Sequence, residues 1–276
     1  QFLDMDVCKD PDYLIQNMYG VQRVVWGSRP RIEFVNGLAI NPWDMTKFPK
    51  YRFFEKFHNL KFIKLGNYFQ KIDILGKQKN LTHLELIDRV DIRGIRELSN
   101  CKNLSFLSIN NDFFHKGEIL KELNQEFKHV FENCKKITTL KLFYVLINDD
   151  AMSMISSRLC SLIIYGTDIT KDVKNMTDLS LIHIGKRCPL LESITIRYNS
   201  YITDQGIDAI AQGCSNLKYA CIKNCSQIHS HQSFINLIKG TRIRSPGHLL
   251  IDEVFVNQLY FFSLKEPSLS HTIKYL

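Results

Sequence analysis

Cysteine and histidine side chains, the usual ligands of zinc, gather in one short stretch of the sequence. It holds Cys221, Cys225, His229 and His231, at a spacing that a zinc site could use. The repeat pattern described below places Cys221 on one face of a strand and Cys225 on the inner edge beyond it. The two thiols therefore point apart, and we expect neither a metal site nor a resident cofactor.

Catalytic motifs give no better indication of an enzyme. The sequence contains no glycine-rich phosphate loop and no Gly-x-Ser-x-Gly nucleophile turn. No pair of carboxylates has a spacing typical of acid–base catalysis, and the nine histidines are scattered along the chain. We expect a non-catalytic protein.

Aromatic and basic residues at related positions suggest a binding surface instead. Aromatic residues and arginine are enriched where proteins bind one another most tightly. A basic and aromatic surface would favour an acidic or phosphorylated segment of a partner. The candidate residues are Lys141, Phe143, Tyr144, Tyr165, Arg197, Tyr198 and Lys223. Whether these side chains meet depends on the elements that carry them.

Composition places the chain among folded proteins. Its 276 residues are 45% hydrophobic, enough to bury a core, and its longest apolar runs are far shorter than the roughly 20 residues of a membrane span. We therefore expect no membrane partner. Eight cysteines are too few for a disulfide scaffold, so we expect reduced thiols and a cytoplasmic or nuclear location.

The net charge of +8 allows a third class of function, a basic nucleic-acid or phospholipid binder. However, the 36 basic residues are interleaved with 28 acidic ones and form no long run. No aromatic RNA-binding signature or zinc-finger spacing accompanies them. Nucleic acid is therefore an unfavoured partner.

The sequence is repetitive, with a strand template of the form apolar-x-x-apolar-x-apolar. The template matches at Val35/Leu38/Ile40, Leu60/Ile63/Leu65, Leu81/Leu84/Leu86, Leu104/Leu107/Ile109, Ile137/Leu140/Leu142, Leu159/Leu162/Ile164, Leu191/Ile194/Ile196 and Leu217/Ala220/Ile222, and more weakly at Val21/Val24/Trp26 and Ile251/Val254/Val256. Steps between first positions from Val35 onward are 25, 21, 23, 33, 22, 32, 26 and 34 residues. We interpret the long steps as insertions.

Helical patterns separate the strands. Residues 176–188 align without a gap with residues 202–214, so one insertion is predicted as a loop between Ile164 and Met176. Thr203 and Asp204 are predicted to begin a helix, with the Asp204 carboxylate accepting hydrogen bonds from free amides at that helix start.

One cysteine position recurs in the repeats. Cys101, Cys134, Cys188 and Cys214 each stand three residues before the first apolar residue of a strand. A small, rather apolar side chain suits the tight corner between helix and strand. We therefore expect these cysteines to be structural.

The segment CPLLESITIRYNSYITDQGIDAIAQGCSNL resembles the cysteine-containing subtype of leucine-rich repeat. The resemblance is strong over residues 176–228, moderate over 81–164 and weak before 60 and after 240. It implies an α/β fold, a right-handed solenoid with parallel strands on its concave side and helices on its convex side. We expect a cap or partial repeat over 1–34, the solenoid over 35–257, and a cap or tail over 258–276.

Proteins with this subtype of repeat are most often F-box proteins, in which the solenoid captures a protein substrate for a cullin-RING ubiquitin ligase. The resemblance thus implies a substrate-recognition arm. No F-box is recognisable in residues 1–59, which prolines interrupt. An F-box adaptor and cullin would then bind through a segment upstream of Gln1, or the chain is a scaffold or assembly factor without an F-box.

Alternation along the strands selects the residues of the concave face, because successive side chains point to opposite sides. The template's apolar residues are buried, so the residues between and just after them face outward. These pairs are Glu85 and Ile87, Ser108 and Asn110, Lys141 and Phe143, Ile163 and Tyr165, Thr195 and Arg197, and Cys221 and Lys223. Tyr144 and Tyr198 follow at strand ends. The alternative is that insertions or irregular strands fold over this face and bury it.

Overall fold

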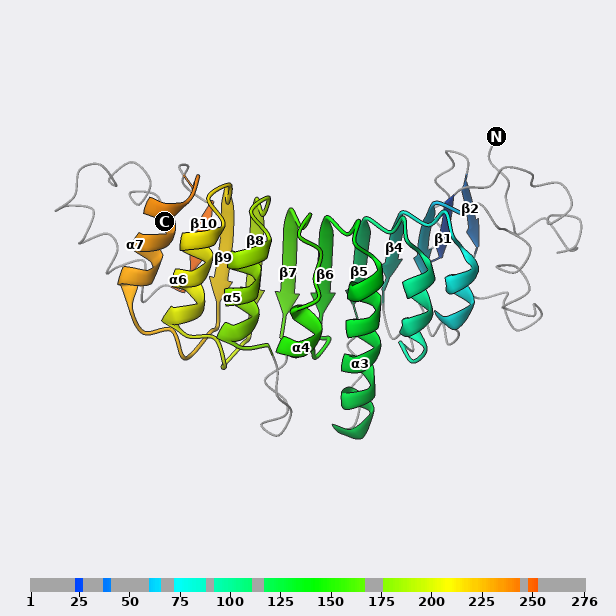
Figure 1. The fold of residues 1–276 in the computed structure, drawn as a ribbon, viewed down its shortest axis with the longest axis horizontal. Helices are drawn as coiled ribbons and strands as arrows, with labels where there is room; N and C mark the ends of the chain where they lie inside the picture. The colour runs from blue at the N-terminus through cyan, green and yellow to red at the C-terminus, as the bar shows by residue number, and fades with distance from the viewer. Residues whose placement is uncertain are drawn as a thin grey trace, which may run out of the picture.

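Parallel strands side by side dominate the structure, a computed structural model that describes residues 23–26, 37–40, 60–65, 72–87, 92–110, 117–166, 176–243 and 248–252. Within these ranges ten strands form one sheet (Figure 1). They are β1 Arg23–Trp26, β2 Gly37–Ile40, β3 Phe62–Leu65, β4 His83–Leu86, β5 Phe106–Asn110, β6 Thr139–Phe143, β7 Ser161–Tyr165, β8 Ser193–Arg197, β9 Tyr219–Lys223 and β10 Leu249–Ile251. The expected α/β fold with a solenoid-like succession of strands is confirmed at this level.

The order of strands follows the chain from β3 to β10 but departs from it at the N-terminal end. There β1 lies between β3 and β2, and Val24 aligns with Leu38 on one side and with Ile63 on the other. A simple stack would instead place β2 against β3. The predicted caps fall largely outside the described residues: 258–276 entirely, and 1–34 except for 23–26.

The strand template sets the register between neighbours. Leu140 of β6 aligns with Leu162 of β7, which aligns with Ile194 of β8. All the template residues from Leu60 to Ile222 are buried. The core is therefore a set of parallel rows of apolar side chains, and burying each one contributes about 1.5–3 kcal/mol relative to exposure.

The sequence prediction assigned the residues of the last strand to the wrong positions of the template. Ile251 was expected at the first template position, but Leu249 and Ile251 align with Ala220 and Ile222, the second and third positions. The template therefore begins at Pro246, whose residue type does not fit an apolar strand pattern. Val254 and Val256, the other residues of the predicted match, lie outside the described residues.

Helical segments connect the strands and all lie on the same side of the sheet (Figure 1). They are the 3-10 helices η3 Ile72–Lys77 and η4 Ile95–Asn100, and the α-helices α3 Gly117–Asn133, α4 Asp149–Met152, α5 Asp178–Arg187, α6 Asp204–Gly213 and α7 His231–Gly240. None of these helices, within the described part of the chain, is long and apolar enough to cross a membrane.

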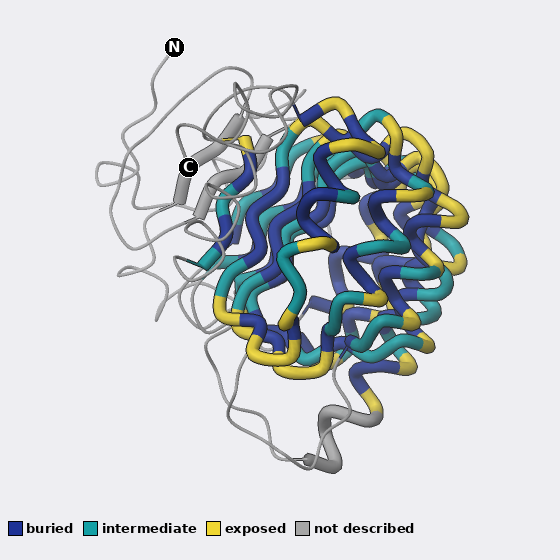
Figure 2. Tube along the Cα trace, turned by 90° about the vertical axis from the view of Figure 1, so that its left-hand side faces the viewer, coloured by how far each residue is buried: buried dark blue, intermediate teal, exposed yellow. Residues whose placement is uncertain are grey.

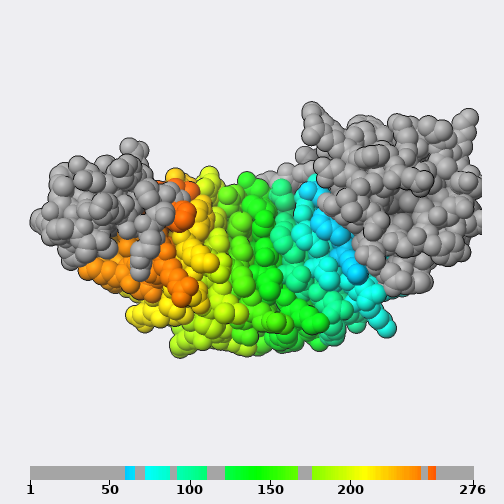
Figure 3. Space-filling model, turned by 90° about the horizontal axis from the view of Figure 1, so that it is seen from above, coloured from blue at the N-terminus to red at the C-terminus, as the bar shows by residue number. Residues whose placement is uncertain are grey.

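The coil of strands and helices encloses the core. Figure 2 shows the buried residues inside the coil and the exposed ones at its outer corners. From above, the row of elements is bowed, with the helices on its rounded side (Figure 3). The step of 33 residues between Leu104 and Ile137 is explained by the long helix α3, which reaches beyond its neighbours in Figure 1. The loop predicted between Ile164 and Met176 falls mostly in 167–175, outside the described residues.

The recurring cysteines join each repeat to the one before it. The thiols of Cys101, Cys134 and Cys188 donate hydrogen bonds to the backbone carbonyls of Leu75, Leu98 and Ser156, at 3.4, 3.3 and 3.5 Å respectively. The Cys214 thiol donates to the backbone carbonyl of Cys188 at 3.7 Å. Burial raises their pKa values to about 11 or 12. These thiols are thus protonated donors, as a structural role requires.

Carboxylates at the start of successive helices make a second set of links. Thr203 caps α6 through its hydroxyl, which accepts from Gln205 N at 3.2 Å. The prediction for Asp204 was wrong: its carboxylate accepts instead from the amides of His229 and Ser230 in the next repeat, at 3.0–3.2 Å. The capping hydroxyl already satisfies the local amide, which leaves the carboxylate to reach forward.

The same link occurs one repeat earlier. Asp178 accepts hydrogen bonds from the Thr203 amide at 2.8 Å and from the Thr203 hydroxyl at 2.6 Å. Gly206 makes room for this carboxylate, since a Cβ there would stand 2.4 Å from Asp178 Oδ1. Asp149 binds Thr177 in the same way, at 2.8 and 2.7 Å.

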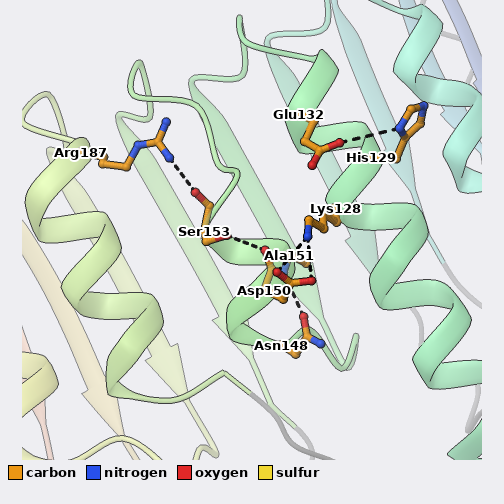
Figure 4. A network of polar contacts seen from close by, with 8 residues as sticks. All are labelled: Lys128, His129, Glu132, Asn148, Asp150, Ala151, Ser153 and Arg187. Atoms are coloured by element: carbon orange, nitrogen blue, oxygen red, sulfur yellow. Dashed lines mark hydrogen bonds and ion pairs between the residues drawn. The ribbon is translucent and has the colours of Figure 1, made fainter.

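The four-residue helix α4 is held from both sides (Figure 4). On one side, Lys128 of α3 contacts the Asp150 carboxylate at 3.0 Å. On the other, Arg187 of α5 donates to the Ser153 carbonyl at 2.8 Å. Asn148 caps the helix by accepting from Ala151 N at 3.0 Å. Contacts from both neighbours compensate for a helix too short to be stable alone.

Removing one forward link tests its contribution to stability. In Asp178→Ala the Thr203 amide and hydroxyl lose their acceptor, so we expect the free energy of unfolding to fall by about 1–3 kcal/mol. Glu192→Gln, which changes an exposed carboxylate in a surface ion pair with Lys218, should change it by less than about 0.5 kcal/mol. Urea unfolding followed by circular dichroism measures both. Equal effects of the two changes would contradict the proposed role of Asp178.

Candidate protein-binding face

In the described part of the chain, the sheet has one face against the helices and one face on which no helix lies, here called the open face. In β6, Leu140 and Leu142 are buried, whereas Lys141 and Phe143 are partly exposed. The same alternation continues in β7, where Ile163 and Tyr165 stand between buried residues. The strands therefore present most of the predicted outward residues in rows that cross the sheet. In β5, β8 and β9 the middle residue of the strand, Ser108, Thr195 and Cys221 respectively, was also expected to face outward but is buried.

Three of the predicted binding residues are in contact in one row. The rings of Phe143 and Tyr165 meet edge to face, with centroids 4.9 Å apart. Arg197 Cζ lies 5.2 Å from the Tyr165 ring centroid, a cation–π distance. Its Nε and Nη2 donate to Cys221 Sγ at 3.4 and 3.3 Å, which raises the pKa of Arg197. The Arg197 guanidinium is therefore held in one orientation.

The other predicted residues surround this row. Lys223 aligns with Arg197 in the adjacent strand β9, and Tyr144 and Tyr198 come directly after β6 and β8. Lys141 belongs to a different contact, because its Nζ lies 5.1 Å from the Phe106 ring centroid. Together, Lys141, Phe143, Tyr144, Tyr165, Arg197, Tyr198 and Lys223 are here called the C-terminal cluster.

A second aromatic row lies toward the N-terminal end and was missed by sequence reasoning. His83 is stacked between Phe62 and Phe106, with ring centroids 4.3 and 3.8 Å apart. Each of these residues stands directly before the second apolar residue of its template. The alternation rule also selects that position, so carrying it one residue further back along each strand would have found the row.

The two ends of the open face differ in charge. At the N-terminal end, Glu85 is bound by Lys64 at 2.7 Å and by His83 at 2.9 Å. The hydrogen bond from His83 and the contacts with Lys64 lower the pKa of Glu85 to about 2, against a burial effect that raises it. Among the described residues, no carboxylate forms an ion pair with Lys141, Arg197 or Lys223. Within the described part of the open face, the cations without an ion pair are therefore those of the C-terminal cluster, and the nearby Asp252 carboxylate accepts instead from the Asn224 amide at 2.9 and 3.1 Å.

Two tyrosines of the cluster have an unusual backbone. Tyr144 and Tyr198 have φ angles of 58° and 56°, in the left-handed region, and their exposed fractions are 43% and 40%. Asn224, at the same position in the next repeat, has φ 57°. Asparagine and glycine adopt this conformation readily, whereas tyrosine does so at a cost of about 1–2 kcal/mol.

Gly166 takes the matching place between the two tyrosines. A Cβ at Gly166 would stand 2.2 Å from the Tyr198 carbonyl oxygen. The edge of the sheet thus presents a large aromatic residue, then no side chain, then a second aromatic residue. Glycine is required at this position because the Tyr198 backbone approaches it closely.

The residues with possible zinc spacing are not brought together. Cys221 Sγ is buried beneath Arg197, while Cys225 Sγ donates to the Lys223 carbonyl at 3.6 Å. Across the described ranges there is no group of three or more His, Cys, Asp or Glu side chains placed to hold a metal ion. The structural cysteines elsewhere are protonated and buried, so they are poorly suited to nucleophilic chemistry.

Comparison with known families adds no assignment, because no protein-family model matches the sequence. The function therefore has to be inferred from the repeat pattern and from the side chains of the open face. Of these side chains, the C-terminal cluster combines aromatic area, uncompensated charge and a strained backbone.

Acid titration tests the Glu85 contacts. Since the folded pKa of Glu85 is about 2 and its ordinary value is 4.5, its ionised form stabilises the fold above about pH 4.5, and this contribution is lost as the pH falls toward 2. We expect the difference in unfolding free energy between the wild type and Glu85→Gln to shrink as the pH falls from about 4.5 toward 2. Glu192→Gln serves as the control. A difference independent of pH would contradict the assignment.

The left-handed backbone at Tyr198 gives a separate test of stability. Tyr198→Asn relieves the backbone cost, so we expect no loss of stability and a gain of up to about 1 kcal/mol. The matched control is Tyr201→Asn, which changes a tyrosine of similar exposure (37%) without a positive φ and should destabilise. Thermal unfolding compares the two, and an equal loss in both would contradict the strain argument.

Proposed function

We propose that the chain is a leucine-rich-repeat solenoid of the cysteine-containing subtype, and that it binds a partner protein on its open face. The C-terminal cluster carries this proposal, since it gathers aromatic rings and cations of the kinds found in binding hot spots. Support for the repeat class comes from the recurring cysteine corner, the aligned template residues and the helices on the opposite side of the sheet.

Preorganisation makes the cluster suitable for binding. Arg197 is already oriented by the Tyr165 ring and by the Cys221 sulfur, so little side-chain entropy remains to be lost when a partner binds. Phe143 supports the same Tyr165 ring. A rigid row of this kind is also an unusual place for two left-handed tyrosines unless their exposed rings have a use.

Within this class we propose the role of substrate-recognition arm of an F-box-type ubiquitin ligase, which would commit the captured protein to ubiquitin-dependent catabolism. The support is the resemblance of residues 176–228 to repeats found most often in F-box proteins. In this role the chain is non-catalytic, and an F-box segment upstream of Gln1 binds the adaptor and cullin.

A scaffold or assembly factor without an F-box is the second candidate, because the open face would bind a partner equally well in that role. For both candidates we infer a cytoplasmic or nuclear location. The support is that seven cysteines of the described ranges are free thiols, as expected in a reducing compartment.

Affinity purification of the natural full-length protein from its own cells, followed by mass spectrometry, separates these roles. We expect to recover a cullin, the F-box adaptor and at least one further stoichiometric protein. Tyr165→Ala combined with Arg197→Ala should reduce recovery of that further protein at least tenfold while the adaptor and cullin remain, since hot-spot truncations commonly cost 2 kcal/mol or more.

Helix-side substitutions provide the matched control. Lys186→Ala with Gln212→Ala changes two residues on α5 and α6, which line a groove on the opposite side of the sheet, and should leave recovery unchanged. Recovery of a partner without adaptor or cullin would favour the scaffold. Loss of the partner only with the helix-side changes would refute binding on the open face.

A further inference from the structure

The open face is asymmetric in its charges, and the asymmetry indicates what kind of partner fits. At one end, the Glu85 carboxylate is already bound by Lys64 and His83. At the other end, Lys141, Arg197 and Lys223 have no carboxylate partner among the described residues. Any partner that covers the C-terminal cluster removes water from these cations.

Desolvation then discriminates between partners. Covering the cations with a neutral or basic segment leaves buried charge unpaired, which disfavours binding, whereas an acidic segment supplies the missing partners. The aromatic part of the cluster does not neutralise this charge: Tyr165 contacts Arg197 only through its uncharged ring, and Phe143 packs against the same ring. They form an apolar floor on which a backbone or an apolar side chain can rest.

The spacing of the cations suits an extended segment. Strands β6, β7, β8 and β9 are consecutive in the sheet, and neighbouring strands are about 4.8 Å apart. Lys141 stands two positions earlier along its strand than the row of Arg197 and Lys223, so the line from Lys141 to Lys223 runs diagonally over about 16 Å. An extended chain rises about 3.3 Å per residue, so about four or five residues cross this distance. Alternate side chains of such a chain point toward the sheet.

We propose that the partner contributes an extended acidic peptide segment, which crosses β6 to β9 with anionic side chains against Lys141, Arg197 and Lys223. This proposal rests on the proposed function and specifies its ligand. Both carboxylates and phosphorylated side chains have the required chemistry, and a guanidinium forms strong charge-assisted hydrogen bonds with either.

A random 12-residue peptide library displayed on phage is the first probe, selected on the full chain. We expect Asp and Glu to be enriched in the selected peptides, and the enrichment to be lost on the variant Arg197→Gln with Lys223→Gln. The control variant, Lys102→Gln with Lys218→Gln, removes the same charge from exposed positions outside the open face and should select the same peptides as the wild type.

Synthetic versions of the selected peptides then separate the sources of negative charge. Fluorescence polarisation compares each peptide with a version in which Asp and Glu are replaced by Asn and Gln, and with a version carrying phosphoserine at those positions. We expect at least a tenfold weaker Kd for the amide version. A phosphoserine version at least tenfold tighter than the carboxylate version would identify a phosphorylated segment as the preferred ligand.

Three results would overturn the proposal: no binding peptides, binding peptides without acidic enrichment, or affinities unchanged by Arg197→Gln with Lys223→Gln. Binding of a 12-nucleotide single-stranded RNA that depends on those two residues would overturn it in favour of nucleic acid. If the natural partner still requires Tyr165 while tolerating loss of both cations, only the acidic segment is refuted, and the proposed function stands.

Discussion

The register between neighbouring repeats is the constraint on which the rest of the structure depends. Because side chains alternate along a strand, a shift of one residue would expose Leu140 and Leu142 and bury Lys141 and Phe143. Links from one repeat to the next oppose that shift at both ends of the helices. Thiols such as Cys188 donate back to the preceding repeat at the helix end, and carboxylates such as Asp178 accept from the following repeat at the helix start.

The residues that fix the register and the residues of the open face are different sets, which explains why the same strands can serve both stability and recognition. The residues that fix the register face the core or lie at the corners, so the open face can vary without loss of the fold. Cys221 is an exception, since it is buried on the open face and orients Arg197. Its thiol contributes to the binding surface through a neighbouring side chain, in contrast to the cysteines at the corners.

Much of the fold could be predicted from the sequence because repetition reports the same local interaction many times. The template identified β3 to β9 and the faces of their residues. It failed where one residue type obscured the pattern, as Pro246 did before β10. The weak match at β1 was in the correct frame, but it did not indicate that β1 lies between β3 and β2, because strand order there depends on contacts between distant strands. The partner of Asp204 could not be predicted either, because a carboxylate at a helix start can bind its own helix or the next, and only the stacking distance decides.

For the candidate site, too, the sequence pattern was sufficient for some features and insufficient for others. Alternation placed Phe143, Tyr165 and Arg197 on one face, but it did not indicate which cations are neutralised, because that depends on pairing across strands. Lys64 and Lys141 occupy equivalent positions, yet Glu85 on the strand next to Lys64 neutralises only the first. Lys141 has Ser108 and Ile163 as its neighbours in register instead. Identical repeat positions therefore acquire different electrostatic roles from their neighbours, and a solenoid can concentrate recognition in one part of a regular sheet.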